Sequence, residues 1–232
     1  MIEESGRTTR RELIKPEDRE TRRIGFIMGW GNTLQDEWLP WFRKKVISEG
    51  WSVLIIELPL EFNNFGRIKI EIEKALNDFR PEFLLCHSMG SLFGRYLSGE
   101  EYRMRIFLSP FWKIPKRTLI FGSYALSYLL LSLLKWCRKP ILNRNFNDSD
   151  IGDIDLPANS PQYISPATMK EVITAQSRMP ELMDRDRTIF SPDDRIIDTS
   201  VCEGITYKGG HFAFCVKDRD AIFTLLSRLI KE

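Results

Sequence analysis

The amino-acid sequence predicts an α/β fold, in which a mostly parallel sheet is flanked by helices. Short apolar runs alternate with amphipathic stretches in steps of about 25 to 30 residues, the usual pattern of strands and helices along a parallel sheet. The alternation stops near residue 110 and resumes near residue 186. The segment between these points is therefore expected to be an insertion over the sheet.

The composition supports a globular chain with a full core. It has 232 residues, 43% of them hydrophobic and 28% charged. A domain of this size buries roughly 70% of the surface of its unfolded chain, so it needs no disulfides to be stable. With 34 basic and 32 acidic residues the net charge is only +2, which excludes a nucleic-acid binder recognised by bulk charge. Four cysteines without CxxC spacing and no apolar N-terminal segment predict a cytoplasmic location, with membrane association left open.

Each expected strand is a short apolar run, and each expected helix has an apolar face. Helices are predicted over residues 37–48, where Gly50 is the stop signal, and over 68–79, 92–97 and 217–230. The six expected strands are residues 24–28, 51–58, 83–86, 104–108, 188–190 and 204–208.

The chain divides into three parts on this interpretation. Residues 1–22 are expected to be a charged, solvated or partly helical arm, residues 23–109 and 186–232 the sheet core, and residues 110–185 a helical cap or lid. Residues 102–147 carry nine basic residues and no acid, whereas residues 148–203 carry twelve acids and five bases. The small net charge therefore hides a basic block beside an acidic one.

A nucleophile motif lies at a predicted strand-to-helix junction. In the pentapeptide CHSMG, residues 86–90, Ser88 is placed on a sharp turn that would expose its hydroxyl. The positions two before and two after the serine must be small, and Cys86 and Gly90 satisfy this requirement. His87 is expected beside the nucleophile but pointing away from it. An ordinary helix N-cap is the alternative interpretation of Ser88.

A serine nucleophile needs a base, and that base needs a carboxylate to orient it. The chain has two histidines, and His211 follows the last predicted strand in a glycine-flanked loop. The carboxylate is expected after the preceding strand, where Asp194 is preferred and Asp193 remains the alternative. One polar and two apolar residues follow Asp194, which favours its placement at the mouth of the strand.

Acyl transfer also needs two amide donors for the oxyanion. The backbone N–H of Met89, directly after the serine, is one candidate. The backbone N–H of Trp30, in the glycine-bracketed loop after the first core strand, is the other.

These motifs, in this order and on these elements, resemble the α/β-hydrolase superfamily of serine esterases and lipases. The match covers about residues 23–110 and 186–232. The resemblance implies the α/β-hydrolase fold, no metal or organic cofactor, and hydrolysis through an acyl-serine intermediate. The sequence departs from the family pattern at Cys86, which replaces a glycine, and at Met28, which replaces a histidine. It also shows no evident antiparallel strands at its N-terminus.

The functional hypothesis is a serine hydrolase of carboxylic esters or thioesters, such as a carboxylesterase, lipase or thioesterase. The apolar cap favours a hydrophobic, lipid-like acyl group, and the basic block favours contact with an anionic head group, an anionic membrane or an acyl carrier. An acyltransferase, a peptidase and a non-catalytic or membrane-peripheral binding protein on the same fold remain alternatives.

Three further patterns have weaker interpretations. Cys86, Cys202, His211 and Cys215 lack the paired spacing of a zinc site, and the aspartates of residues 148–155 lack the pattern of a calcium loop. Residues 118–134 contain no charge, and would span about 25 Å as a helix, which is short for a membrane span. A cap helix over the serine is preferred to a helix resting on a membrane.

Overall fold

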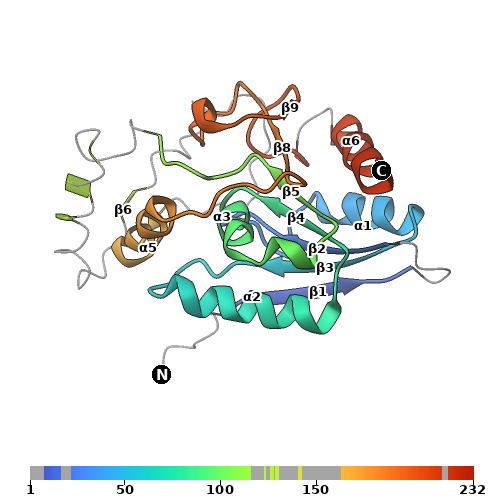
Figure 1. The fold of residues 1–232 in the computed structure, drawn as a ribbon, viewed down its shortest axis with the longest axis horizontal. Coiled ribbons are helices and arrows are strands. Elements are labelled where there is room, and N and C mark those ends of the chain that lie inside the picture. Colours follow the sequence, from blue (N-terminus) through green and yellow to red (C-terminus); the bar gives the residue numbers. More distant parts are fainter. Residues whose placement is uncertain are drawn as a thin grey trace.

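The structure is a computed structural model that describes residues 8–16, 22–115, 163–215 and 219–232, with residues 123, 126–127, 129–130 and 141–142. In this part of the chain a seven-stranded sheet has the order β1-β3-β2-β4-β5-β8-β9 (Figure 1). Only the β1–β3 pair is antiparallel, which confirms the predicted, mostly parallel α/β sheet. The strands are β1 (Arg10–Ile14), β2 (Arg22–Ile27), β3 (Trp51–Glu57), β4 (Phe83–His87), β5 (Met104–Leu108), β8 (Arg187–Phe190) and β9 (Ile205–Thr206).

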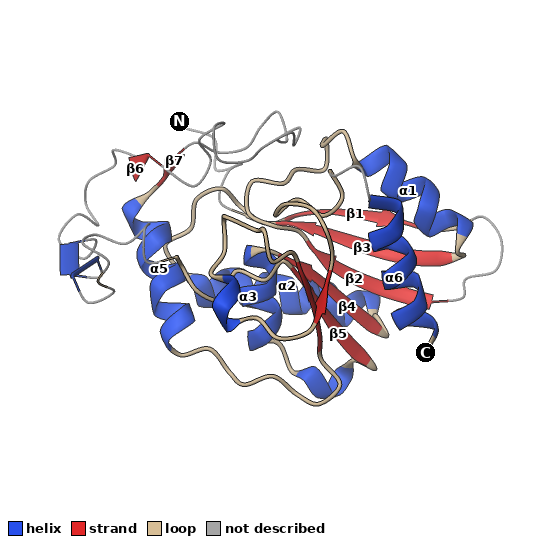
Figure 2. Ribbon diagram, turned by 90° about the horizontal axis from the view of Figure 1, so that it is seen from above, coloured by secondary structure: helices blue, strands red, loops and turns tan. Residues whose placement is uncertain are grey.

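Helices cover both faces of this sheet (Figures 1 and 2). On one face α1 and α6 pack into a shared apolar cluster, and on the other face α2 and α3 do the same. Gly50 has a φ of 72° just after the first of these helices, as expected for the predicted stop. The described helices are α1 (Leu39–Ser48), α2 (Phe65–Phe79), α3 (Met89–Tyr96), α5 (Pro166–Ser177) and α6 (Arg219–Lys231), with short 3₁₀ turns at Gly99–Glu101 and Thr199–Val201.

The central strands are apolar on both sides because each of their faces is covered. In β2, Phe26 packs against the cluster of α1 and α6, whereas the next residue, Ile27, packs against the cluster of α2 and α3. Successive side chains of a strand point to opposite faces. Continuous apolar runs, rather than alternating ones, are therefore the correct signal for these strands.

The N-terminal segment differs from the prediction of a solvated or partly helical arm. Arg10–Ile14 form β1, which pairs with β3 along its whole length and lies at one edge of the sheet. Arg43 of α1 donates two hydrogen bonds of 2.7 Å to the carboxylate of Glu12. The charged residues of β1 thus belong to a partly exposed edge strand, and the antiparallel strand that seemed absent from the sequence is present.

Part of the predicted cap is described, and it packs on the core. In α5 the hydroxyl of Thr168 donates to the carbonyl oxygen of Phe62, and the hydroxyl of Tyr96 in α3 donates to Ala175 at 2.6 Å. A two-stranded ribbon joins β6 (Ile141–Leu142) to β7 (Tyr163–Ile164). Most of the uncharged stretch 118–134, and all of the acidic residues 148–155, lie outside the described residues. Among the described helices, none has the length and apolar character needed to cross a membrane.

Candidate active site

Ser88 lies on the sharp turn between β4 and α3, where the backbone is strained. Its φ of 51° and ψ of −122° are unusual for a residue with a side chain, and such a conformation costs of order 1–3 kcal/mol. The turn is held from both sides, because the amide of Ser88 donates to Leu108 of β5 and the amide of Phe111 donates to the carbonyl oxygen of Ser88. Backbone strain maintained by surrounding bonds is common where a side chain must be presented.

Steric constraints explain why positions 86 and 90 of the pentapeptide carry small residues. A Cβ atom on Gly90 would collide with the backbone carbonyl oxygens of Ile27 and Met28, so this position requires glycine. Cys86 is tolerated two residues before the serine because its sulfur lies over Gly94 of α3, in space that any side chain there would fill. The cysteine is fully buried, and burial raises the pKa of its thiol.

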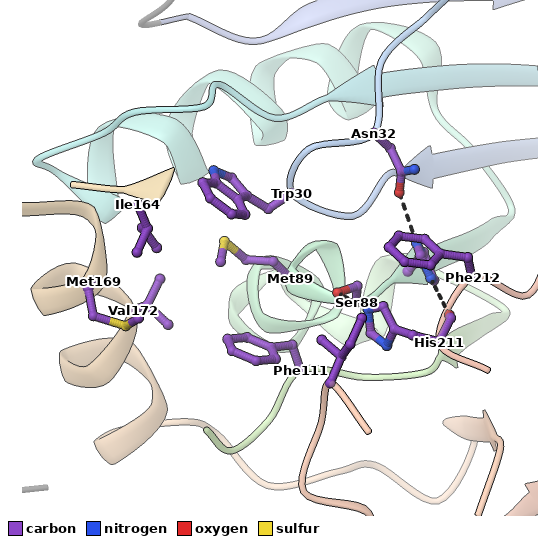
Figure 3. A pocket seen from close by; sticks show the side chains of 12 residues that line it. Trp30, Asn32, Ser88, Met89, Phe111, Ile164, Met169, Val172, His211 and Phe212 are labelled. Atoms are coloured by element: carbon purple, nitrogen blue, oxygen red, sulfur yellow. Dashed lines mark hydrogen bonds between the residues drawn. The ribbon is translucent and has the colours of Figure 1, made fainter. Parts of the chain in front are cut away.

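The structure brings Ser88, His211 and Asp194 together from separate loops. Nε2 of His211 lies 2.7 Å from Oγ of Ser88, and Nδ1 of His211 lies 2.8 Å from Oδ2 of Asp194. All three residues are buried, whereas the alternative carboxylate, Asp193, is exposed. Figure 3 shows the imidazole directly beside the serine.

Asp194 is held in its charged form. Burial alone would raise the pKa of this carboxyl group, but the attraction of His211 and hydrogen bonds lower it overall. Two of those bonds come from the backbone amides of Ile196 and Ile197, at 2.8 and 3.3 Å from Oδ1. An ionised Asp194 favours the tautomer of His211 with its proton on Nδ1. Nε2 is then free to accept the proton of Ser88.

The glycine-flanked loop that carries His211 is anchored to the sheet. The hydroxyl of Tyr207 donates to the carbonyl oxygen of Gly210 at 2.7 Å and is bonded in turn to Ser109. The hydroxyl of Ser191 donates to the carbonyl oxygen of Gly209, which has a φ of 140° that suits only glycine. These bonds hold the imidazole of His211 in position, although two consecutive glycines precede it.

Both predicted oxyanion residues line the same pocket as Ser88. Met89 is the first residue of α3, so its amide is one of the first four in the helix that have no intrahelical acceptor. The indole of Trp30 is fixed by a 2.9 Å hydrogen bond to the carbonyl oxygen of Leu60. Figure 3 places both side chains near the serine.

The fold of this chain is similar to that of several solved structures. No model of a known protein family matches the sequence, and no curated protein matches it. A crystal structure of monoacylglycerol lipase from Paleococcus ferrophilus matches with a TM-score of 0.70 over 96% of this chain and 98% of that chain, at 14% identity. This chain has the α/β-hydrolase fold. The resemblance drawn from the motifs is therefore confirmed at the level of the fold.

Two further structures with this fold cover nearly the whole chain. A soluble variant of monoglyceride lipase from Saccharomyces cerevisiae, in complex with a substrate analog, matches with a TM-score of 0.68 over 96% of this chain and 91% of the other, at 14% identity. An alpha/beta hydrolase from Penicillium has a TM-score of 0.63 over 94% and 92%, also at 14% identity. At these identities the comparison establishes the α/β-hydrolase fold alone.

A hydrogen-bonded group beside the triad was not predicted. Nδ1 of His87 lies 3.2 Å from Oδ1 of Asn32, and Nε2 of His87 lies 3.0 Å from the carbonyl oxygen of His211 (Figure 3). The amide nitrogen of Asn32 donates to Asp36 at 2.9 Å. His87 thus connects the loop after β2 to the loop of His211. One indication of this hydrogen-bonded group was present in the sequence: Asn32 is a polar residue directly after the glycine-bracketed turn.

The walls of the pocket beside Ser88 are apolar. The free volume is only about 30 Å³ in this conformation, room for no more than a few water molecules. A larger group would have to displace side chains, and the unbranched thioether of Met169 is suited to such movement. The apolar lining residues are Trp30, Met89, Phe111, Ile164, Met169, Val172, Ile196 and Phe212.

Nothing in this site suggests a bound metal. Among the described residues there is no group of three or more His, Cys, Asp or Glu side chains that could hold an ion. The polar residues that line the pocket are Asn32, His87, Ser88 and His211.

Proposed function

We propose that the protein is a serine hydrolase of carboxylic esters or thioesters, with Ser88, His211 and Asp194 as its catalytic triad. The observation that carries the proposal is the 2.7 Å contact between Ser88 Oγ and a histidine whose other nitrogen bonds to a buried, charged carboxylate. The strained turn that presents Ser88 to the pocket supports it independently. The fold of the lipase and hydrolase structures is consistent with the same chemistry.

The proposed reaction has two halves. Ser88 Oγ attacks the carbonyl carbon while Nε2 of His211 takes its proton, and the amides of Met89 and Trp30 stabilise the negative charge on the carbonyl oxygen. His211 then gives the proton to the departing alcohol or thiol, which leaves an acyl-serine. A water molecule, deprotonated by His211, attacks the acyl carbon, and the proton returns to Ser88 as the acid is released.

The acyl group is proposed to be hydrophobic. The side chains that line the pocket from α5 and from β7 are apolar, namely Met169, Val172 and Ile164. Contact of the basic block with an anionic membrane or an acyl carrier rests largely on residues 116–144, most of which lie outside the described residues. That contact, the lid and the cytoplasmic location remain predictions of the sequence.

Labelling with a fluorophosphonate tests the proposal, because this probe reacts with an activated serine and needs no knowledge of the substrate. We expect covalent modification of the wild-type chain at Ser88, located by mass spectrometry of the peptide. Replacing Ser88 by Ala should abolish labelling and lower the hydrolysis of p-nitrophenyl esters by about 10⁴-fold or more.

Ser91 provides a matched control on the same helix. Its hydroxyl donates to the carbonyl oxygen of Cys86 and is buried away from the pocket. The Ser91→Ala variant should therefore still be labelled at Ser88. A folded wild-type chain that is not labelled, or that is labelled equally after Ser88→Ala, would contradict the proposal.

A further inference from the structure

A second cavity also lies against α5, where it is lined by other residues of that helix than the active-site pocket. Its volume is about 900 Å³, within the range of about 300–1,000 Å³ that is typical of small-molecule sites. None of the described residues that line it lines the active-site pocket. The residues of this second cavity are Arg95, Trp112, Lys113, Ile173, Thr174, Gln176, Ser177, Arg178, Met179, Leu182 and Val201.

Three side chains of the second cavity hold buried polar atoms that have no hydrogen-bond partner among the described residues. They are Nε of Arg95, Nε1 of Trp112 and Oε1 of Gln176. The amide of Gln176 cannot gain by turning over, because its nitrogen already donates to the carbonyl oxygen of Phe111 at 3.0 Å. Buried polar groups of folded proteins nearly always have a partner, so three exceptions at one cavity point to a missing ligand.

Arg95 is a buried cation without an ion-pair partner among the described residues. One of its terminal nitrogens donates to the carbonyl oxygen of Pro180, and Asp186 and Glu181 attract its charge from beyond ion-pair distance. Arg95 is more than nine-tenths buried, and its guanidinium lies 4.9 Å from the centre of the Trp112 ring. Burial lowers its pKa to about 10, so the group stays charged at neutral pH. A buried, unpaired cation favours an anionic ligand.

The other residues that line the second cavity indicate the chemistry of the rest of the ligand. Lys113 and Arg178 add two cations, of which Lys113 already forms a 3.3 Å ion pair with Asp198, and none of the described lining residues is acidic. Ile173, Met179 and Leu182 supply an apolar wall for a hydrocarbon chain. The two unpartnered nitrogens offer hydrogens to an acceptor, whereas the oxygen of Gln176 needs a donor.

We propose that the second cavity binds an amphiphilic carboxylate whose head group also carries an N–H donor, as in an N-acyl amino acid. Arg95 and Trp112 donate to the carboxylate, Gln176 accepts the N–H, and the acyl chain lies along the apolar wall. The ligand of the second cavity neither contacts Ser88 nor reacts. This binding site is therefore separate from the proposed catalytic site.

Binding is best measured by isothermal titration calorimetry with the full-length Ser88→Ala protein, so that no hydrolysis can occur. The probe is N-dodecanoylglycine below its micellar concentration, and the comparison is N-dodecanoylethanolamine, which keeps the amide and the chain but lacks the carboxylate. We expect one molecule of the glycine conjugate per chain, bound at least tenfold more tightly than the ethanolamide. Failure of the proposed hydrolysis leaves this result unaffected.

Two matched pairs of variants locate the site. Thr174→Trp fills the second cavity and should abolish binding, whereas Met169→Trp, on the same helix but facing the active-site pocket, should leave binding within about twofold. Arg178→Glu should weaken binding about tenfold through charge reversal, and Arg67→Glu at an exposed position of α2 should not. Thermal unfolding by circular dichroism checks that each chain is folded, and the exposed Arg178 carries the test where Thr174→Trp does not fold.

Three results would overturn the proposal. The first is no binding heat with the glycine conjugate, and the second is equal affinity for the uncharged ethanolamide. The third is binding that Met169→Trp abolishes while Arg178→Glu leaves it unchanged, which would assign the ligand to the active-site pocket.

Discussion

Hydrogen bonding and burial have opposite effects on the charge of His87. Both ring nitrogens lie within hydrogen-bond distance of oxygen atoms, on Asn32 and on the backbone of His211, which a doubly protonated ring would satisfy. Burial, with a further contribution from His211, instead lowers the pKa of His87 to about 3. Burying an unpaired cation costs several kcal/mol, whereas one unmade neutral hydrogen bond costs about 1 kcal/mol. The ring is therefore neutral at pH 7, with its proton on Nε2.

This protonation state predicts a pH-dependent stability. Below pH 6.5 the unfolded chain binds a proton at His87, but the folded chain does not until about pH 3. The free energy of unfolding should thus fall as the pH is lowered through this window, by up to about 1.4 kcal/mol per pH unit. Urea denaturation of wild type and His87→Gln at pH 7, 6 and 5 measures the difference, since the variant lacks this contribution.

The depressed pKa of Asp194 does not interfere with this comparison. Its contribution to stability is complete above the ordinary pKa of 3.8 and is lost only at lower pH, in both proteins. Parallel pH profiles for wild type and His87→Gln would show that the folded protein binds the proton at His87 as readily as the unfolded chain.

Among the strands of the seven-stranded sheet, β1 is the one that local sequence did not predict. Its five residues, RRELI, are mostly charged, because an edge strand is covered on one side only and can keep polar side chains in water. Pairing with β3, which begins about 40 residues later, decides its structure. The apolar contacts of β1 come mainly from one residue. Such a strand has no apolar periodicity, so this pattern cannot predict it.

Adjacent positions of β1 test this strand. Ile14 is 6% exposed and packs into the core, whereas Leu13 is 47% exposed. We expect Ile14→Ala to lower the free energy of unfolding by about 2–4 kcal/mol, and Leu13→Ala to lower it by less than about 1 kcal/mol. Chemical denaturation measures both values. Equal, small effects would indicate that the segment is a loosely attached arm, as the sequence predicted.

Across the whole molecule, one buried ion pair connects distant parts of the core. Arg105 of β5 donates to both carboxylate oxygens of Asp186, at 2.8 and 2.6 Å, and to the carbonyl oxygens of Gly94 and Leu97 at the end of α3. Both charged side chains are almost fully buried. The pair thus joins the helix that follows the nucleophile to the residue just before β8. In the sequence, this ion pair was indicated by a single charged residue, Arg105, within an apolar strand.

Breaking this pair should affect the entire fold. Removing one partner leaves the other charge buried and unpaired, so Arg105→Met should lower the free energy of unfolding by about 3–5 kcal/mol. Adding Asp186→Asn removes the orphaned charge and should recover part of that loss. Denaturation of the single and double variants measures both. A double variant that is less stable than the single one would show that the charge of Asp186 has another partner.

The sequence by itself determined the alternation of strands and helices, the position of Ser88 at a strand-to-helix turn, and the need for a small residue at position 90. These features depend on periodicity and sterics within a few residues. Only the tertiary structure decided which carboxylate bonds to His211, that His87 joins two loops, that Cys86 fits over Gly94, and that α5 lines two cavities with different residues. Those relations link residues far apart in the chain, so they are set by how the helices and loops pack against the sheet.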